Sequence, residues 1–394
     1  MKTIQTLLLF FFLLALFPIN QAGAKEQKEL ELQSESAVLM DAKSGQILYG
    51  KNENKRMNPA SITKIATAIY ALEHANLHDK VIVSENATKV EGTKVYLEAG
   101  EVVTMEKLII GMLLNSGNDA AVAIAEHIDG SVGNFARHIN NYLVENIGVT
   151  ETHFENPNGL FGKNHYTTAA DMAKITKYAE QNNDFRKIFG MKEYNWNGQS
   201  WNTKLLTHHR LLKGEYPYET ATITGGKNGF IQEAGFTLVT AAEKNNQHFI
   251  VVTMKSNEKK APYADTIELL DYGFSHFATE YIPKGLVFMK NGTKYIADEN
   301  IYYTVEKGKR YSKTVNEQGI LTIDSGDRKD LVPHFQLRVQ STSPKQAPLE
   351  NTEQGNFSKM ISMEAVANLG ILAFFTMGIV LILRYRTKLY PWNE

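Results

Sequence analysis

The spacing of apolar residues predicts several helices and strands in the chain up to residue 277. Within residues 61–74 the apolar positions are Ile62, Ile65, Ile69 and Leu72, which is the spacing of one helical face. Short apolar or alternating runs bounded by turn residues predict strands. On these criteria we expect further helices at residues 105–115, 119–128, 135–147, 168–181 and 264–277, strands at 37–41, 46–50, 235–242 and 248–255, and a surface loop at Trp196–Trp201.

The pattern changes after about residue 280. Short alternating stretches at residues 302–305, 319–323 and 335–339 predict a small all-β module. Residues 341–358 are rich in Ser, Thr, Pro, Gln and Asn, and a segment with so few large apolar groups is typical of a linker. The expected divisions are a first domain over residues 25–277, a β-rich domain over 278–340 and a linker over 341–363.

The N-terminal segment has the pattern of a secretory signal. Lys2 is followed by an apolar run from Leu7 to Phe17 and then by the small residues Ala22–Ala24. The apolar run is too short to span a bilayer. These features predict a signal peptide over residues 1–24, cleaved after Ala24.

The C-terminal segment predicts a membrane anchor. The run from Ala365 to Leu383 contains no charged residue and, as a helix, is about as long as the hydrocarbon core is thick. Three basic residues follow at once, and basic residues stay on the cytoplasmic side. We therefore expect a transmembrane helix over residues 364–384, a cytoplasmic tail over 385–394, and both domains on the extracellular side of the cell membrane.

Composition excludes some kinds of chemistry. The chain has 394 residues, a formal net charge of −1 and no cysteine. Disulfides, thiol nucleophiles and cysteine metal sites are therefore excluded, and the near-neutral charge does not indicate nucleic-acid binding. The pair His208-His209 has no third histidine or carboxylate at the spacing of a metal site, so we expect no metal.

Three short motifs occur in one order along the chain. They are Ser61-Ile-Thr-Lys64, Ser116-Gly-Asn118 and Lys227-Asn-Gly229. Short motifs also arise by chance, because Ser256–Lys259 fits the first pattern and Ser84–Asn86 fits the second. The context of each motif therefore has to decide which one carries chemistry.

Ser61 and Lys64 have the context of a nucleophile and its base. They are three residues apart at the start of a predicted helix and so share one face. The helix start directs N–H groups and the positive end of the dipole at Ser61. A serine hydroxyl is a weak nucleophile until a base takes its proton. A lysine is such a base only when neutral, which requires burial or a nearby cation, and Lys227 is a candidate for that cation.

The other two motifs each have a simpler structural interpretation. Ser116–Asn118 separates two predicted helices, and Ser or Asn is also the usual residue that caps a helix. Lys227 stands among Gly225, Gly226 and Gly229, which also fits a plain glycine turn. The residues alone leave both interpretations open.

Taken together, the motifs resemble those of the penicillin-binding protein and serine β-lactamase superfamily. The flanking residues are similar to those of the low-molecular-mass D-alanyl-D-alanine carboxypeptidases. The similar segments are residues 59–64, 114–121, 154–160 and 269–274, and the likeness covers roughly residues 35–280. The resemblance implies an α+β fold: a β-lactamase/transpeptidase-like domain with an antiparallel sheet flanked by helices and a helical subdomain, then a small all-β domain and a C-terminal membrane helix.

The resemblance also implies an activity and roles for residues. The protein would be a serine hydrolase without a cofactor that removes the terminal D-alanine from peptidoglycan pentapeptide stems, and β-lactam antibiotics would inhibit it by acylating the same serine. Ser61 would be the nucleophile, Lys64 its base, and Ser116 the proton relay to the leaving group. The implied substrate-binding residues are Asn118, Lys227, Asn228, Gly229 and Phe230, with the N–H groups of Ser61 and Phe230 as the oxyanion hole.

Several positions depart from that family's pattern. Asn228 stands where threonine is usual, Phe230 where histidine or tyrosine is usual, and Asn158 where histidine is usual. Residues 261–265 lack the arginine that some members carry there. An asparagine is larger than the threonine that would bind the substrate carboxylate, and its amide is planar. It should therefore misplace the substrate, so we expect slow hydrolysis of D-alanyl-D-alanine peptides.

Two other functions fit parts of the sequence. A serine β-lactamase would need a deacylating glutamate between the second and third motifs, and the nearest are Glu151 and Glu155. Both lie in or beside the segment that resembles the carboxypeptidases. A penicillin-binding wall protein that is weakly active or non-catalytic would fit the changes at Asn228 and Phe230.

Overall fold

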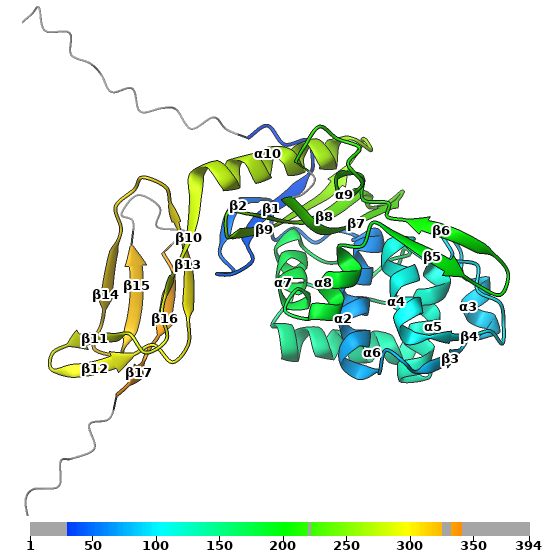
Figure 1. Ribbon diagram of the computed structural model, residues 1–394, viewed down its shortest axis with the longest axis horizontal. Helices are drawn as coiled ribbons and strands as arrows, with labels where there is room; N and C mark the ends of the chain where they lie inside the picture. The colour runs from blue at the N-terminus through cyan, green and yellow to red at the C-terminus, as the bar shows by residue number, and fades with distance from the viewer. Residues whose placement is uncertain (1–29, 220–221, 325–331, 341–394) are drawn as a thin grey trace, which may run out of the picture. The chain divides into compact units, whose positions relative to one another are not determined.

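The computed structural model describes residues 30–219, 222–324 and 332–340, which form a domain of sheet and helices and a β-rich domain (Figure 1). The predicted signal peptide, linker, membrane anchor and cytoplasmic tail lie outside these residues. Among the described residues, no helix is both long enough and apolar enough to cross a membrane.

A five-stranded antiparallel sheet forms the centre of the first domain, in the order β2-β1-β9-β8-β7. The N-terminal hairpin therefore pairs with a strand some 200 residues later, for example Val38 with Val252. The strands are β1 (Ser36–Asp41), β2 (Ile47–Lys51), β7 (Ile223–Ile231), β8 (Gly235–Lys244) and β9 (Gln247–Ser256), which confirms the four predicted ones.

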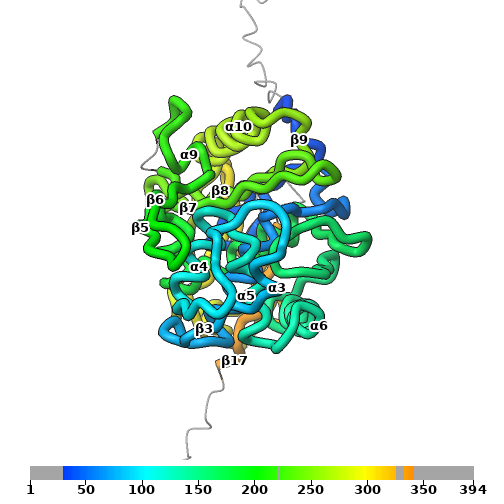
Figure 2. Tube along the Cα trace, turned by 90° about the vertical axis from the view of Figure 1, so that its right-hand side faces the viewer, coloured from blue at the N-terminus to red at the C-terminus, as the bar shows by residue number. Residues whose placement is uncertain are grey.

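Both faces of this sheet are covered by other elements. Successive side chains of a strand point to opposite sides, and here the side chains on both sides belong to apolar cores. In β1, Val38 and Met40 belong to one apolar core, whereas Ala37 and Leu39 belong to the other. One face carries α9 (Arg210–Lys213) and α10 (Ala261–His276). The opposite face carries the larger helical layer (Figure 1 and Figure 2), made of α2 (Lys64–His74), α4 (Met105–Leu114), α5 (Asn118–Asp129), α6 (Val132–Tyr142), α7 (Ala169–Ala179) and α8 (Asn183–Phe189).

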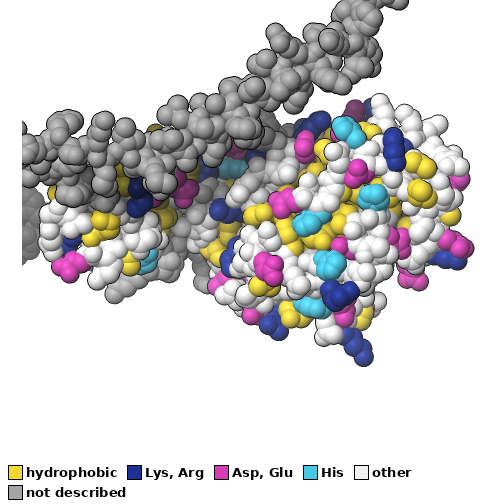
Figure 3. All heavy atoms as spheres, turned by 90° about the horizontal axis from the view of Figure 1, so that it is seen from below, with side chains coloured by type: hydrophobic (Ala, Val, Ile, Leu, Met, Phe, Trp, Pro, Cys, Tyr) yellow, Lys and Arg dark blue, Asp and Glu magenta, His cyan; other side chains and the backbone are white. Residues whose placement is uncertain are grey.

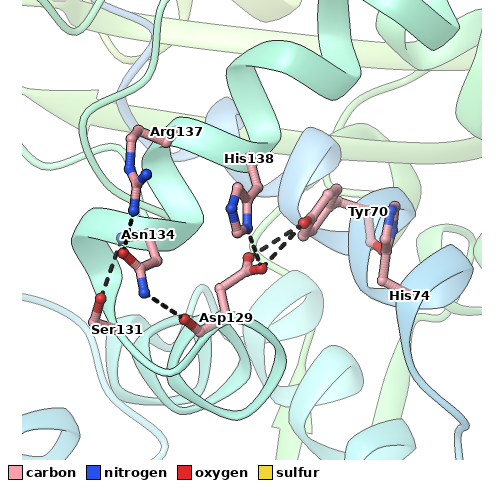
Figure 4. Close-up of polar contacts among 7 residues, drawn as sticks. All are labelled: Tyr70, His74, Asp129, Ser131, Asn134, Arg137 and His138. Carbon is pink, nitrogen blue, oxygen red and sulfur yellow. Dashed lines mark hydrogen bonds and ion pairs between the residues drawn. The ribbon is translucent and has the colours of Figure 1, made fainter.

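Polar contacts join three of these helices at their surface. Tyr70 of α2 donates to the carboxylate of Asp129 at the end of α5 (3.2 Å), and His138 Nδ1 of α6 lies 2.5 Å from the same carboxylate (Figure 4). Ser131 caps α6 by accepting the N–H of Asn134.

The view from below shows several histidines on one face of this domain (Figure 3). In the part of the chain that the structure describes, no three His, Asp or Glu side chains converge as a metal site would require.

The β-rich domain has an apolar core of its own, which includes Tyr303, Leu321 and Ile323. Its three small antiparallel sheets confirm the strands predicted after residue 280. They are β10 (Phe277–Ile282) with β13 (Ile301–Glu306); β11 (Val287–Lys290), β12 (Thr293–Ile296) and β17 (Arg338–Val339); and β14 (Ser312–Val315), β15 (Ile320–Asp324) and β16 (His334–Gln336).

The surface loop predicted at Trp196–Trp201 is wrong in part. Residues on both sides of a short turn form a hairpin of β5 (Glu193–Asn197) and β6 (Asn202–Leu206). Trp196 is buried in the main core, because Tyr194 and Trp196 alternate with polar residues in β5 and both face that core. Helix α8 was not predicted. The remaining segments are β3 (Lys80–Ile82), β4 (Val102–Thr104) and α3 (Glu85–Lys89).

Asp265 of α10 fixes the start of the described chain, and its removal should destabilise the fold. Its buried carboxylate accepts the N–H groups of Gln33 (3.0 Å) and Ser34 (2.7 Å) and the Ser34 hydroxyl (2.5 Å). Asp265→Ala leaves these donors without their charged acceptor, so it should lower the free energy of unfolding by about 3 kcal/mol in urea denaturation. Glu233→Ala, at an exposed carboxylate, is the matched control. An Asp265→Ala protein as stable as the control would show that this contact does not hold the terminus.

Candidate active site

Ser61 lies in a strained turn just before α2. It belongs to a short 3₁₀ helix, η1 (Ala60–Thr63), and the residue before it, Ala60, has a left-handed φ of +51°. The backbone at Gly159 supports this turn, since a Cβ there would lie 1.9 Å from the carbonyl oxygen of Ala60. Only glycine allows that approach, so the 154–160 segment packs directly beneath the nucleophile turn.

Lys64 is fully buried and faces Ser61. Its Nζ lies 2.9 Å from Ser61 Oγ, 2.8 Å from Asn118 Oδ1 and 2.6 Å from the carbonyl oxygen of Asn158. Burial, and after it the positive charge of Lys227, lowers the pKa of Lys64 well below its ordinary value, although the Asp119 carboxylate acts in the opposite direction. A neutral amine at this distance can accept the Ser61 proton.

Ser116 is not a helix cap. It has a left-handed φ of +62°, the cap position of α5 is Gly117, and no side chain caps that helix. Instead, Ser116 Oγ accepts a hydrogen bond from Lys227 Nζ (3.1 Å). Asn118 uses its carbonyl oxygen on Lys64 and donates its Nδ2 to the backbone of Glu91 (2.7 Å). The break between α4 and α5 therefore serves the site.

Lys227 lies inside strand β7 and not in a glycine turn. Its side chain is buried, and its Nζ also donates to the carbonyl oxygen of Asn228 (2.8 Å). Burial lowers the pKa of Lys227 to about 7. None of the described aspartates or glutamates forms an ion pair with it. The structure thus places one buried amine beside each of the two serine hydroxyls.

The rest of the third motif borders Ser61 and a cavity. A Cβ at Gly229 would lie 2.7 Å from Ser61 N and 2.5 Å from Thr237 Oγ1, so β7 runs directly against the nucleophile backbone. The exposed ring of Phe230 packs on Phe236 with a centroid distance of 4.5 Å. Asn228, Gly229 and Phe230 line a cavity of about 730 Å³ together with His208, Arg210, Lys213, Glu215, Phe236, Thr237, Lys259, Pro262 and Tyr263.

The sequence analysis missed His165, which supports the nucleophile turn from below. Its Nδ1 accepts the N–H of Glu155 (3.0 Å), and its Nε2 lies 3.0 Å from Thr63 Oγ1, which in turn donates to the carbonyl oxygen of Ala60 (2.9 Å). Burial is the main reason why the pKa of His165 falls to about 3, so the ring is neutral. A single histidine in a polar segment carries no sequence signal of this role.

The competing sequence matches lie in other surroundings. Ser256 is buried against Ser34 (2.7 Å between the two Oγ atoms). Of the glutamates considered for a β-lactamase, Glu151 pairs with Arg56 and Glu155 accepts the N–H of Asn164. His209 accepts the N–H of Leu212 and contacts Thr240, as expected of a structural histidine.

Comparison with known proteins places this geometry in one family. The family described as D-alanyl-D-alanine carboxypeptidase matches residues 22–258. The D-alanyl-D-alanine carboxypeptidase DacF of Bacillus subtilis is 32% identical over 359 residues, which cover 88% of this chain and 87% of that protein. DacA of Haemophilus influenzae is 31% identical and covers 81% of this chain and 78% of its own.

Solved structures agree with the sequence comparison. Penicillin binding protein 5 of Haemophilus influenzae superposes with a TM-score of 0.68 at 29% identity, covering 78% of this chain and 97% of that one. DacD of Francisella tularensis gives a TM-score of 0.67 at 25% identity, covering 82% and 98%. A family match over more than half of the chain, relatives alike along most of their length and a shared fold lead to one conclusion: the chain belongs to the D-alanyl-D-alanine carboxypeptidase family.

Proposed function

We propose that this protein is a serine-type D-alanyl-D-alanine carboxypeptidase that removes the terminal D-alanine from peptidoglycan pentapeptide stems and binds penicillin covalently. One observation carries the proposal: the buried amine of Lys64 lies 2.9 Å from Ser61 Oγ in a member of this family. A serine with a neutral lysine beside it is an activated nucleophile.

Acylation would use the site as follows. Lys64 takes the proton of Ser61, and Ser61 Oγ attacks the carbonyl carbon of the penultimate D-alanine. The oxyanion is held by the N–H groups of Ser61 and Phe230. When the C–N bond breaks, Ser116 relays to the leaving amine the proton that Lys64 took from Ser61. Lys227, 3.1 Å from Ser116, supplies positive charge near the substrate carboxylate.

Deacylation returns the free enzyme. Water attacks the acyl carbonyl and gives a proton to Lys64. The C–Oγ bond then breaks as this proton passes to Ser61 Oγ, which releases the shortened stem. A β-lactam reacts in the same first step, but its ring opens and its leaving nitrogen stays attached to the acyl group. Asn118, held by Lys64 and by the backbone of Glu91, would bind the amide of the acyl portion. Asn228 in place of threonine is expected to slow the reaction of peptides with a free carboxylate.

The cellular location is a further part of the proposal. The apolar N-terminal run and the uncharged run Ala365–Leu383 followed by basic residues support export and anchoring. The carboxypeptidase domain over residues 25–277 and the β-rich domain over 278–340 would then lie outside the cell membrane, tethered by the linker at 341–363.

The nucleophile can be tested with the purified full chain and fluorescent penicillin. Ser61→Ala should abolish covalent labelling and the release of D-alanine from a D-alanyl-D-alanine peptide, because it removes the hydroxyl that lies 2.9 Å from Lys64 Nζ. Ser256→Ala, the matched serine of the competing motif, should keep its label. Labelling that persists in Ser61→Ala would refute the assignment of the nucleophile.

The pH dependence of kcat/KM should report Lys227. Because burial lowers the pKa of Lys227 to about 7, the free enzyme loses this cation as the pH rises through neutrality, and kcat/KM for a substrate with a free carboxylate should fall. In Lys227→Arg the guanidinium keeps its charge, so the remaining activity should not fall in that range. Lys255→Arg, at an exposed lysine, should retain the fall. If Lys227→Arg retains it too, another group titrates there.

The anchor can be tested by shortening the chain. The full chain should sediment with the membrane fraction of the producing bacterium, whereas a chain that ends at Gln340 should be found outside that fraction and still bind fluorescent penicillin. Sedimentation of the shortened chain with membranes would mean that a segment other than residues 364–384 attaches it.

A further inference from the structure

Tyr96 is held in a strained backbone conformation with its side chain exposed. Its φ is +58°, in the left-handed region that residues with a bulky side chain rarely adopt. The residue is 59% exposed, so burial of the ring does not compensate for the strain. Strained conformations of this kind persist where the surroundings impose them, and they are often found at binding sites.

The strain at Tyr96 is imposed by Asp119, the residue that follows Asn118. The buried Asp119 carboxylate accepts the N–H of Val95 (3.0 Å) and of Leu97 (3.1 Å), one on each side of Tyr96. Clamped at both neighbours, the backbone turns the intervening side chain outward. The turn that positions Asn118 for catalysis therefore also fixes Tyr96.

The segment around Tyr96 packs directly on the catalytic turn. The N–H of Asn118 donates to the carbonyl oxygen of Thr93 (2.7 Å), and Asn115 Nδ2 donates to that of Lys94 (2.9 Å). Together with the contact of Asn118 Nδ2 to Glu91, these bonds place residues 91–97 along the second motif. Tyr96 is thus an exposed aromatic residue on the wall that carries Asn118.

Trp201 supports the ring of Tyr96 from the turn between β5 and β6. The two rings meet edge to face, with centroids 5.2 Å apart and planes at 87°. Trp201 Nε1 donates to the carbonyl oxygen of Val95 (2.7 Å), and Ser200 Oγ donates to that of Tyr96 (2.5 Å). Two separate segments therefore hold an aromatic pair in a fixed orientation.

The two sides of the site differ in chemical character. The cavity beside Asn228 is lined by the cations Arg210, Lys213 and Lys259 and by one carboxylate, Glu215. That side suits the anionic end of a ligand. The side of the second motif presents Tyr96 and Trp201, which suit an apolar group.

We propose that Tyr96, supported by Trp201, binds the apolar part of the acyl arm of the substrate, the portion that stays on Ser61 after the leaving group departs. This inference rests on the proposed function, in which Asn118 binds the amide of the same acyl portion. The arm then leaves the site along residues 91–97, and its apolar part stacks on the Tyr96 ring.

Two β-lactams that differ only in their acyl arm test this inference. Benzylpenicillin carries a phenyl group there, whereas 6-aminopenicillanic acid has the same bicyclic ring and carboxylate without the arm. The measurement is the second-order rate constant of acylation of the full chain by each compound, expressed as their ratio. Tyr96→Ala should lower the ratio about 3- to 10-fold, the range expected for one lost aromatic contact, and Tyr96→Phe should preserve it.

A second variant separates binding from structure. Glycine adopts a positive φ without strain, so Tyr96→Gly should unfold at the same or a higher temperature than the unaltered chain, yet lower the ratio as Tyr96→Ala does. Val102→Ala, at an exposed apolar residue of strand β4, should leave the ratio unchanged.

The possible failures are distinguishable. An unchanged ratio in both Tyr96→Ala and Tyr96→Gly, with acylation still observed, would overturn this inference and leave the proposed function standing. If neither compound acylates the unaltered chain, the proposed function fails and this inference fails with it.

Discussion

The chemistry of this protein depends on the burial of two lysine side chains in one site. Lys64 and Lys227 are both almost inaccessible to water, and burial disfavours the charged form of each amine. The charge of Lys227 adds to the effect on Lys64. A lysine at the surface would remain protonated at neutral pH and could not take a proton from Ser61. Burial therefore favours the neutral amine of Lys64 that its proposed role as base requires.

The sheet makes this burial possible by bringing distant segments together. Lys227 lies on β7, which runs so close to the backbone of Ser61 that a Cβ at Gly229 would lie 2.7 Å from Ser61 N. The N-terminal hairpin pairs with β9, and the helical layer packs against the face of the sheet that bears Val38 and Met40. Ser61, Ser116 and Lys227 come from three different parts of the chain, and this rigid frame sets their distances.

Three strained backbone positions lie in the functional turns. Ala60, Tyr96 and Ser116 all have left-handed backbones, although none is glycine. Each is held by a specific contact: Gly159 lies beneath Ala60, Asp119 clamps both neighbours of Tyr96, and Lys227 bonds to Ser116. Since such conformations are costly by themselves, the surrounding packing must impose them. The stability of the domain thus supports the geometry of its active site.

The amino-acid sequence by itself determined most of the helices and strands and indicated which residues are candidates for the chemistry. Apolar periodicity is a local property, so it located the helix after Ser61, the two strands joined by the turn after Asp41, and the small β-rich domain. The sequence also contains the three motifs and the departures at Asn228 and Phe230. Only the tertiary structure decided that Lys227 lies in a strand, that Ser116 bonds to it instead of capping a helix, and that Trp196 is buried. Only the tertiary structure also showed that His165 supports the nucleophile turn and that Asp119 accepts the N–H groups on both sides of Tyr96. The physical reason is that burial, pKa and side-chain contacts depend on separate segments, which are 24 residues apart for Asp119 and Val95 and 111 apart for Ser116 and Lys227. No local pattern in the sequence records which of them will meet.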